Sequence, residues 1–209
     1  IYLSIYLSLS LSLSIYLSLY FVGALSLSIQ LSSLLRLPLP MHAPGTWLGV
    51  ECDALGLRVE RLNFYNFQLE GEVNSTALAQ LTALRYLEFG SNKLEGAMPD
   101  IGHACNLEEY WTYNNLFSGQ APASIGLMSN LVSAFIGINA LTGLLPPYGD
   151  PTLGYQLPNI RRLHIDNNLL SGELPSSLGE LKELRYIPFY GCRFEGQLPD
   201  SLGQLTNLI

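Results

Sequence analysis

Apolar residues recur in one fixed frame along the chain from Arg58 onward. The frame reads L-x-x-L-x-L-x-x-N-x-L and occurs six times. One copy consists of Leu84, Leu87, Phe89, Asn92 and Leu94. Each copy is followed by a glycine, 23 to 29 residues from the next: Gly71, Gly96, Gly119, Gly143, Gly172 and Gly196. Six copies in register indicate a solenoid, in which each unit buries its apolar face against its neighbours.

The central x-L-x-L-x part of each copy alternates with the period of a strand. It predicts one short parallel strand per repeat, with the leucines inside and the intervening residues on an open concave face. The glycine, and the proline that stands three residues after five of the six glycines, shape the return path. We therefore expect an α/β fold: a right-handed solenoid of about six repeats over residues 59–209, with short helical or irregular return segments.

A polar position follows each predicted strand. We expect its side chain to turn inward and satisfy backbone groups of the adjoining turns. Asparagine fills four of the six copies, cysteine the last, and Phe67, which has no donor, the first. The ladder is Asn92, Asn115, Asn139, Asn168 and Cys192.

The repeat length and two long motifs carry a family resemblance. Leu-x-Gly-x-Leu-Pro is followed by x-Ser-Leu-Gly-x-Leu in Leu170–Leu181 and, with Phe in the first place, in Phe194–Leu205. This resembles the plant-type leucine-rich repeat of receptor-like kinases, receptor-like proteins and polygalacturonase-inhibiting proteins. The resemblance implies a recognition scaffold and leaves the ligand open. Trp47-x-Gly49-Val50-x-Cys52-Asp53 is similar to the end of that family's N-terminal cap, so residues 41–58 are expected to be a cap remnant.

Residues 1–40 differ from the rest in composition. They consist mainly of Leu, Ser, Ile and Tyr in low-complexity repeats. Three interpretations stay open: a signal peptide or membrane anchor, a strand-prone tract, or translated simple-sequence DNA, since an ATCT repeat encodes Ile-Tyr-Leu-Ser. The chain begins with Ile, and a seventh repeat should begin where it ends. We therefore expect a fragment that aggregates when it is expressed alone.

Charge and residue types exclude several functions. The chain has 10 Lys and Arg against 17 Asp and Glu, a net charge of −7, which argues against a nucleic-acid partner. His42, His103 and His164 lie in separate segments without metal-ligand spacing. No phosphate loop, nucleophile elbow or kinase signature occurs. We expect no cofactor and no enzyme in this segment, although a kinase could lie outside it, and free thiols at Cys52, Cys105 and Cys192.

The outward positions of the predicted strands are rich in aromatic rings. Exposed Tyr and Trp side chains favour a partner-binding face, although neighbouring rings could instead only stack along the sheet. His164 and Asp166 suggest an acid–base pair, but polar contacts on an exposed strand are the better interpretation. The expected partner-binding residues are Tyr65, Tyr86, Trp111, Tyr113, Phe135, His164, Asp166, Tyr186 and Tyr190.

These patterns predict a non-catalytic module that binds a protein, a peptide or a glycan. By resemblance it would belong to a cell-surface receptor-like protein, with membrane association through the N-terminal segment. A secreted enzyme inhibitor of the polygalacturonase-inhibiting kind and a cytoplasmic scaffold are the alternatives. Asn74 begins an Asn-Ser-Thr sequon, which accepts a glycan if the chain is secreted.

Overall fold

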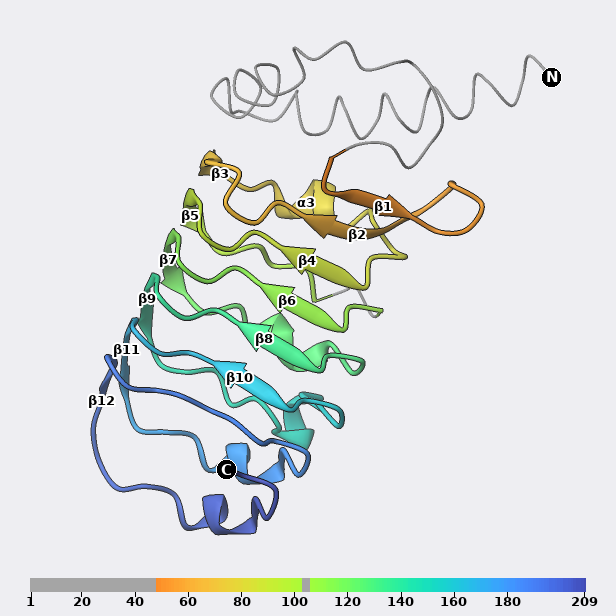
Figure 1. Ribbon diagram of the computed structural model, residues 1–209. Coiled ribbons are helices and arrows are strands. Elements are labelled where there is room, and N and C mark those ends of the chain that lie inside the picture. The colour runs from red at the N-terminus through yellow and green to blue at the C-terminus, as the bar shows by residue number, and fades with distance from the viewer. Residues whose placement is uncertain (1–47, 103–105) are drawn as a thin grey trace, which may run out of the picture.

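The computed structural model describes residues 48–102 and 106–209 as a stack of coils that follow one another in chain order from β2 to β12 (Figure 1). His42, Trp47, His103 and Cys105 lie outside the described residues, as does the whole segment 1–40. Among the described residues, no helix has the length and apolar character needed to cross a bilayer.

The predicted strands form a first sheet with the order β1-β2-β4-β6-β8-β10. Its members are β1 (Val50–Cys52), β2 (Val59–Asn63), β4 (Tyr86–Glu88), β6 (Glu109–Trp111), β8 (Ser133–Phe135) and β10 (Arg162–His164). All neighbours pair in parallel except β1, which is antiparallel to β2. The sixth repeat adds only a single bridge, between Arg162 and Tyr186. This parallel sheet and the stacked coils confirm the predicted solenoid.

A second parallel sheet was not predicted. It has the order β12-β11-β9-β7-β5-β3 and is built from the Leu-x-Gly segments that we had assigned to the return path. Its strands are β3 (Glu70–Glu72), β5 (Lys93–Ala97), β7 (Leu116–Gln120), β9 (Ala140–Gly143), β11 (Leu169–Gly172) and β12 (Arg193–Phe194). The repeat glycine in each coil has a positive φ, between 76° and 94°. That conformation is costly for residues with a Cβ, which explains why glycine recurs there.

The return segments are short. Within residues 48–102 and 106–209 they comprise one α-helix, α3 (Ser75–Leu78), and four 3₁₀ helices: η1 (Ala123–Leu127), η2 (Pro151–Leu153), η3 (Ser176–Glu180) and η4 (Asp200–Gln204). The 3₁₀ helices η1, η3 and η4 each follow a proline with extended backbone. Proline fits there because the first amide groups of a helix have no partner within the helix.

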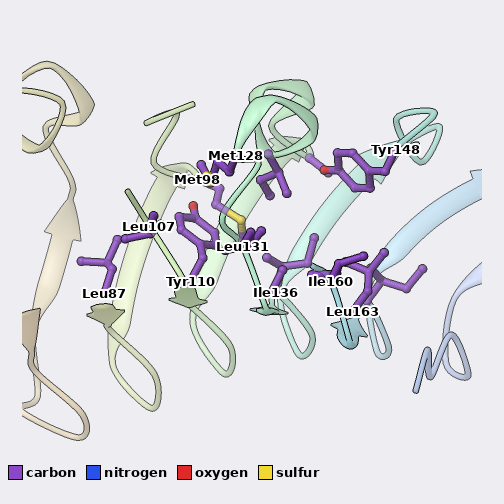
Figure 2. Close-up of a cluster of buried hydrophobic side chains, with 14 of the residues drawn as sticks. Leu87, Met98, Leu107, Tyr110, Met128, Leu131, Ile136, Tyr148, Ile160 and Leu163 are labelled. Atoms are coloured by element: carbon purple, nitrogen blue, oxygen red, sulfur yellow. The ribbon is translucent and has the colours of Figure 1, made fainter. Parts of the chain in front are cut away.

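The core is one continuous cluster that runs through all the coils. Figure 2 shows Leu87, Tyr110, Ile136 and Leu163 from successive coils, with Met98 and Met128 above them in the view. All of these side chains are buried. One repeat has too few apolar residues to exclude water from its own leucines, so the coils are stable only when stacked.

The overlong fourth repeat is anchored in this core. The long interval of 29 residues from Gly143 to Gly172 predicts that the segment from Pro146 to Pro151 bulges outward as a contact loop. Instead, the Tyr148 ring is fully buried, and its hydroxyl donates to the carbonyl of Pro122 at 2.8 Å. Residues 151–154, which include η2, are exposed, and so is Gln156. The aromatic ring explains the difference, because burying it stabilises the insertion against the core.

Ile138 occupies a strained turn. Its φ is +53°, and the matching position of other repeats holds Asn66, Ser91, Asn114 and Asn167, also with positive φ. A β-branched residue is unfavourable in this region, whereas asparagine tolerates it. Because Ile138 is 47% exposed, its replacement removes little packing. We expect Ile138→Asn to stabilise the fold by about 1 kcal/mol, measured as a higher urea midpoint; an unchanged or lower midpoint would contradict the strain.

Candidate ligand-recognition face

The outward residues of the first sheet form three parallel rows, one for each x in x-L-x-L-x. In the first row, Tyr86 pairs with Arg61 and Glu109, and Arg162 pairs with Ser133 and Tyr186. The second row is Asn63, Glu88, Trp111, Phe135 and His164. The third row, two residues further along each repeat, is Tyr65, Gly90, Tyr113, Gly137, Asp166 and Tyr190.

Five rings from the first two rows make an unbroken chain across the sheet, which we call the aromatic strip: Tyr86, Trp111, Phe135, His164 and Tyr186. Successive ring centroids lie 5.4, 5.0, 4.0 and 5.0 Å apart. The rings of Trp111 and Phe135 are stacked with an angle of 8° between their planes. Contacts at these distances stabilise the sheet and fix each ring in place.

Charged side chains of the first row contact the rings of the aromatic strip. The Arg61 guanidinium lies 3.7 Å from the centroid of the Tyr86 ring, a cation–π contact. Arg162 lies 5.5 Å from the Phe135 centroid and donates to the Ser133 hydroxyl. The Trp111 indole N–H donates to the Glu109 carboxylate at 2.9 Å. The strip is therefore pre-organised, and its rings lose little further freedom when a partner binds.

Glycines in the third row make room for neighbouring side chains. A Cβ at Gly90 would come within 2.5 Å of both the Tyr113 ring and the Glu88 carboxylate. A Cβ at Gly137 would meet the Asp166 carboxylate at 2.7 Å. Tyr113 reaches across to Tyr65, with centroids 6.4 Å apart. Both glycines thus allow large or charged groups to lie flat on the sheet.

Glu88 is the least expected residue of this face. Its side chain sits on an outward position, yet the residue is only 2% exposed. Burial raises the pKa of its carboxyl to about 7, although the hydrogen bond from the Gly90 amide acts in the opposite direction. Burial, together with the nearby Glu88 charge, also raises the pKa of Tyr113 to about 12.

We expected Asp166 to be an exposed contact residue, but this was wrong, because Asp166 is only 6% exposed. Its carboxylate accepts a hydrogen bond from the Asn167 side-chain amide, and it lies 3.9 Å from Nδ1 of the His164 ring. Burial lowers the pKa of His164, although Asp166 opposes the shift. His164 is consequently uncharged at neutral pH and acts as another ring of the strip.

Comparisons with known proteins agree with this geometry. The Leucine Rich Repeat family profile matches residues 159–181. Pollen receptor-like kinase 1 of Arabidopsis thaliana is 32% identical over 65% of this chain and 23% of its own length. The ectodomain of the Arabidopsis receptor kinase GASSHO1/SCHENGEN3 superposes with a TM-score of 0.72 and 32% identity, over 78% of this chain and 19% of that one. The crystal structure of a Pollen Receptor Kinase 3 superposes with a TM-score of 0.68 at 27% identity and covers 79% of this chain and 77% of that one.

The chain covers 85% of the LRR ectodomain of the Arabidopsis receptor kinase SOBIR1 at 30% identity. It belongs to the plant-type leucine-rich-repeat proteins. It spans about a quarter of the length of Pollen receptor-like kinases 1 and 2, to both of which it is similar in sequence. Most of the length of those two kinases is therefore not matched by this segment of leucine-rich repeats.

The predicted partner-binding residues of this leucine-rich-repeat protein lie together on the face, at different depths. Tyr65, Tyr186 and Tyr190 are exposed. The half-buried ones are Tyr86, Trp111, Tyr113, Phe135 and His164. The rings stack on one another and also keep part of their surface exposed, and partner binding on this face stays a prediction. Our sequence reasoning missed Arg61, Glu88 and Arg162, although their outward places in the frame could have indicated them.

Other predicted sites are simpler. The Asn74 Oδ1 accepts from the Ala77 amide and caps α3, which leaves its amide nitrogen available to carry a glycan. Cys52 and Cys192 are free thiols. In residues 48–102 and 106–209, no three His, Cys, Asp or Glu side chains form a group that could hold a metal ion.

Proposed function

We propose that this protein is a non-catalytic recognition module of a plant cell-surface receptor-like protein, and that it binds a peptide or protein through the aromatic strip. The carrying observation is the strip itself: five ordered rings in contact, with Tyr186 exposed and the others half-buried. Pre-organised Tyr and Trp side chains are typical of binding hot spots.

The structural relatives support a peptide as the ligand class. The GASSHO1/SCHENGEN3 ectodomain was solved in complex with CASPARIAN STRIP INTEGRITY FACTOR 2, and PEPR1 with AtPEP1. The PEPR1 structure covers 86% of this chain at 28% identity with a TM-score of 0.72. A peptide can run along the rings and follow the curvature of the stacked strands, as an extended chain does.

The test is a selection from a displayed library of random 12-residue peptides against the full chain. The double variant Trp111→Ala with Tyr113→Ala is expected to bind the selected peptides more than tenfold more weakly, because both rings are lost. Its melting temperature should fall by only a few degrees, since neither ring belongs to the core. Tyr155→Ala removes a ring away from the strip and is the matched control. Equal binding by the double variant would overturn the proposal.

Cell-surface placement predicts a glycan at Asn74. Protein made through a plant secretory pathway should lose one glycan's mass on endoglycosidase treatment, and Thr76→Ala should abolish that shift. Thr76→Ala is the better variant because it removes the sequon but keeps the Asn74 cap of α3. A wild-type band that does not shift on endoglycosidase treatment would contradict glycosylation at Asn74.

A further inference from the structure

One group on the recognition face has no counter-charge. The Glu88 carboxylate accepts a hydrogen bond from the Gly90 amide at 2.5 Å. Among the described residues, no Lys, Arg or His lies within ion-pair distance of it. Glu109 lies 3.8 Å from the Arg162 guanidinium and accepts from Trp111, and Asp166 lies beside the His164 ring and accepts from the Asn167 side-chain amide. A buried carboxylate is costly without a cation, and within the part of the chain that the structure describes Glu88 has neither a cation nor an imidazole beside it.

The surroundings of Glu88 are aromatic. Tyr86 precedes it on the same strand, Trp111 is its register partner on β6, and the Tyr113 ring meets the carboxylate above Gly90. The faces of such rings carry partial negative charge. Rings and a carboxylate together attract a cation and repel an anion.

We propose that Glu88 is the floor of a subsite for a basic side chain of the ligand, an arginine of an extended peptide, flanked by Tyr86, Trp111 and Tyr113. This deepens the proposed function and rests on it. When the ligand binds, the Tyr113 ring moves aside from Gly90 and the guanidinium enters the space that the ring leaves. The displaced ring then stacks on the guanidinium.

Arginine fits this subsite better than other cations. Its guanidinium is planar, less strongly hydrated than an ammonium group, stacks on aromatic faces and pairs with a carboxylate through two hydrogen bonds. The protein itself already uses the same stacking, with Arg61 on Tyr86. The net charge of −7 further favours the approach of a basic peptide.

The first test uses two synthetic peptides, Ac-Phe-Arg-Phe-NH2 and its neutral citrulline analogue, titrated into the full chain at pH 8 and followed by NMR. Wild type is expected to bind the arginine peptide at least tenfold more tightly. Glu88→Gln should abolish the preference. Glu95→Gln, on the exposed side of β5, removes the same charge from the opposite sheet and should retain it. Equal affinities in wild type, or no saturable binding of the arginine peptide, would overturn the proposal.

The second test is the pH dependence of the same affinity. The groups facing Glu88 are Tyr86 on its own strand, Tyr113 and Glu109 from the β6 repeat, and Arg61 beyond Tyr86. The pKa of Tyr113 is about 12 and that of Tyr86 is raised, so neither tyrosine ionises below pH 8. With a Glu88 pKa of about 7, affinity should rise roughly 30-fold from pH 5.5 to pH 8 in wild type. It should stay flat in Glu88→Gln; a flat wild-type profile would contradict the subsite.

A variant that retains the charge separates the subsite from simple electrostatics. Gly90→Ala retains the Glu88 charge but puts a methyl group against both the Glu88 carboxylate and the Tyr113 ring, each of which a Cβ there would approach to 2.5 Å. It should weaken the arginine peptide more than the citrulline peptide, whereas a long-range charge effect would leave the preference intact. If the library peptides depend on Trp111 and Tyr113 but not on Glu88, the proposed function stands and only this inference fails.

Discussion

Asn115→Ala is expected to lower the free energy of unfolding by about 3 to 5 kcal/mol. The Asn115 amide nitrogen donates to the carbonyls of Phe89, Thr112 and Tyr113, and its oxygen accepts from the Leu94 amide. Alanine leaves the buried Leu94 amide without its acceptor and removes one donor from each of the three carbonyls, which keep their bonds from Asn92, Asn139 and the Ser91 amide. Urea denaturation followed by far-UV circular dichroism measures the loss.

Two variants make this prediction specific. Asn159→Ala removes one amide-to-carbonyl bond between coils, from Asn159 to Ser129, at an exposed position, and should cost less than about 1 kcal/mol. Asn115→Cys should be intermediate, because Cys192 fills the equivalent place and its thiol donates to the Ile165 carbonyl at 3.3 Å. Equal losses for Asn115→Ala and Asn159→Ala would show that the ladder adds no special stability.

The ladder also explains why so much of the fold could be predicted from sequence. The other asparagines repeat the Asn115 pattern: Asn92, Asn139 and Asn168 each donate to carbonyls of their own coil and of the preceding one. The requirement to pair these groups and to bury the leucines is the same in every coil. Identical requirements select identical residues at fixed spacing, and such periodicity is visible in one sequence.

The second sheet could not be predicted in the same way. Its strands have two to five residues, and Lys93-Leu94-Glu95 alternates too briefly to be told from a turn. Their pairing partners come from neighbouring coils, for example Glu95 with Leu116. That pairing follows from the pitch of the stacked coils, which depends on how the first sheet and the core pack.

The sequence predicted which residues point outward on this face, but it did not predict how deeply each of them is buried. The frame specifies that Glu88 and Asp166 start outward from the sheet. Their burial depends on the neighbouring coils: Tyr113 lies over Gly90 beside Glu88, and Tyr190 reaches back to Asp166. A side chain from the next repeat covers each acid, and a frame that treats repeats one at a time does not contain that contact.

Raising the pH through the interval from 4.5 to 7 is expected to destabilise wild type relative to Glu88→Gln, by on the order of 2 kcal/mol. The Glu88 pKa is about 7 in the folded chain, against 4.5 for an ordinary glutamate. Below pH 4.5 the carboxyl is protonated in both states, and glutamine mimics it. Between the two values the unfolded chain ionises first, which favours unfolding. Above pH 7 both states are ionised, and the difference stays constant.

Denaturation midpoints at pH 4.5, 6 and 8 measure this difference. Glutamine keeps an acceptor for the Gly90 amide, so the variant changes the ionisation while the hydrogen bond remains. The denaturation midpoint of Glu95→Gln should differ from that of wild type by the same amount at all three pH values. If the midpoints of wild type and Glu88→Gln differ by the same amount at all three pH values, the Glu88 carboxyl is solvated in the folded chain, and the cost of burial does not raise its pKa. The same cost is what a ligand cation would relieve, so the stability curve and the arginine preference should disappear together in Glu88→Gln.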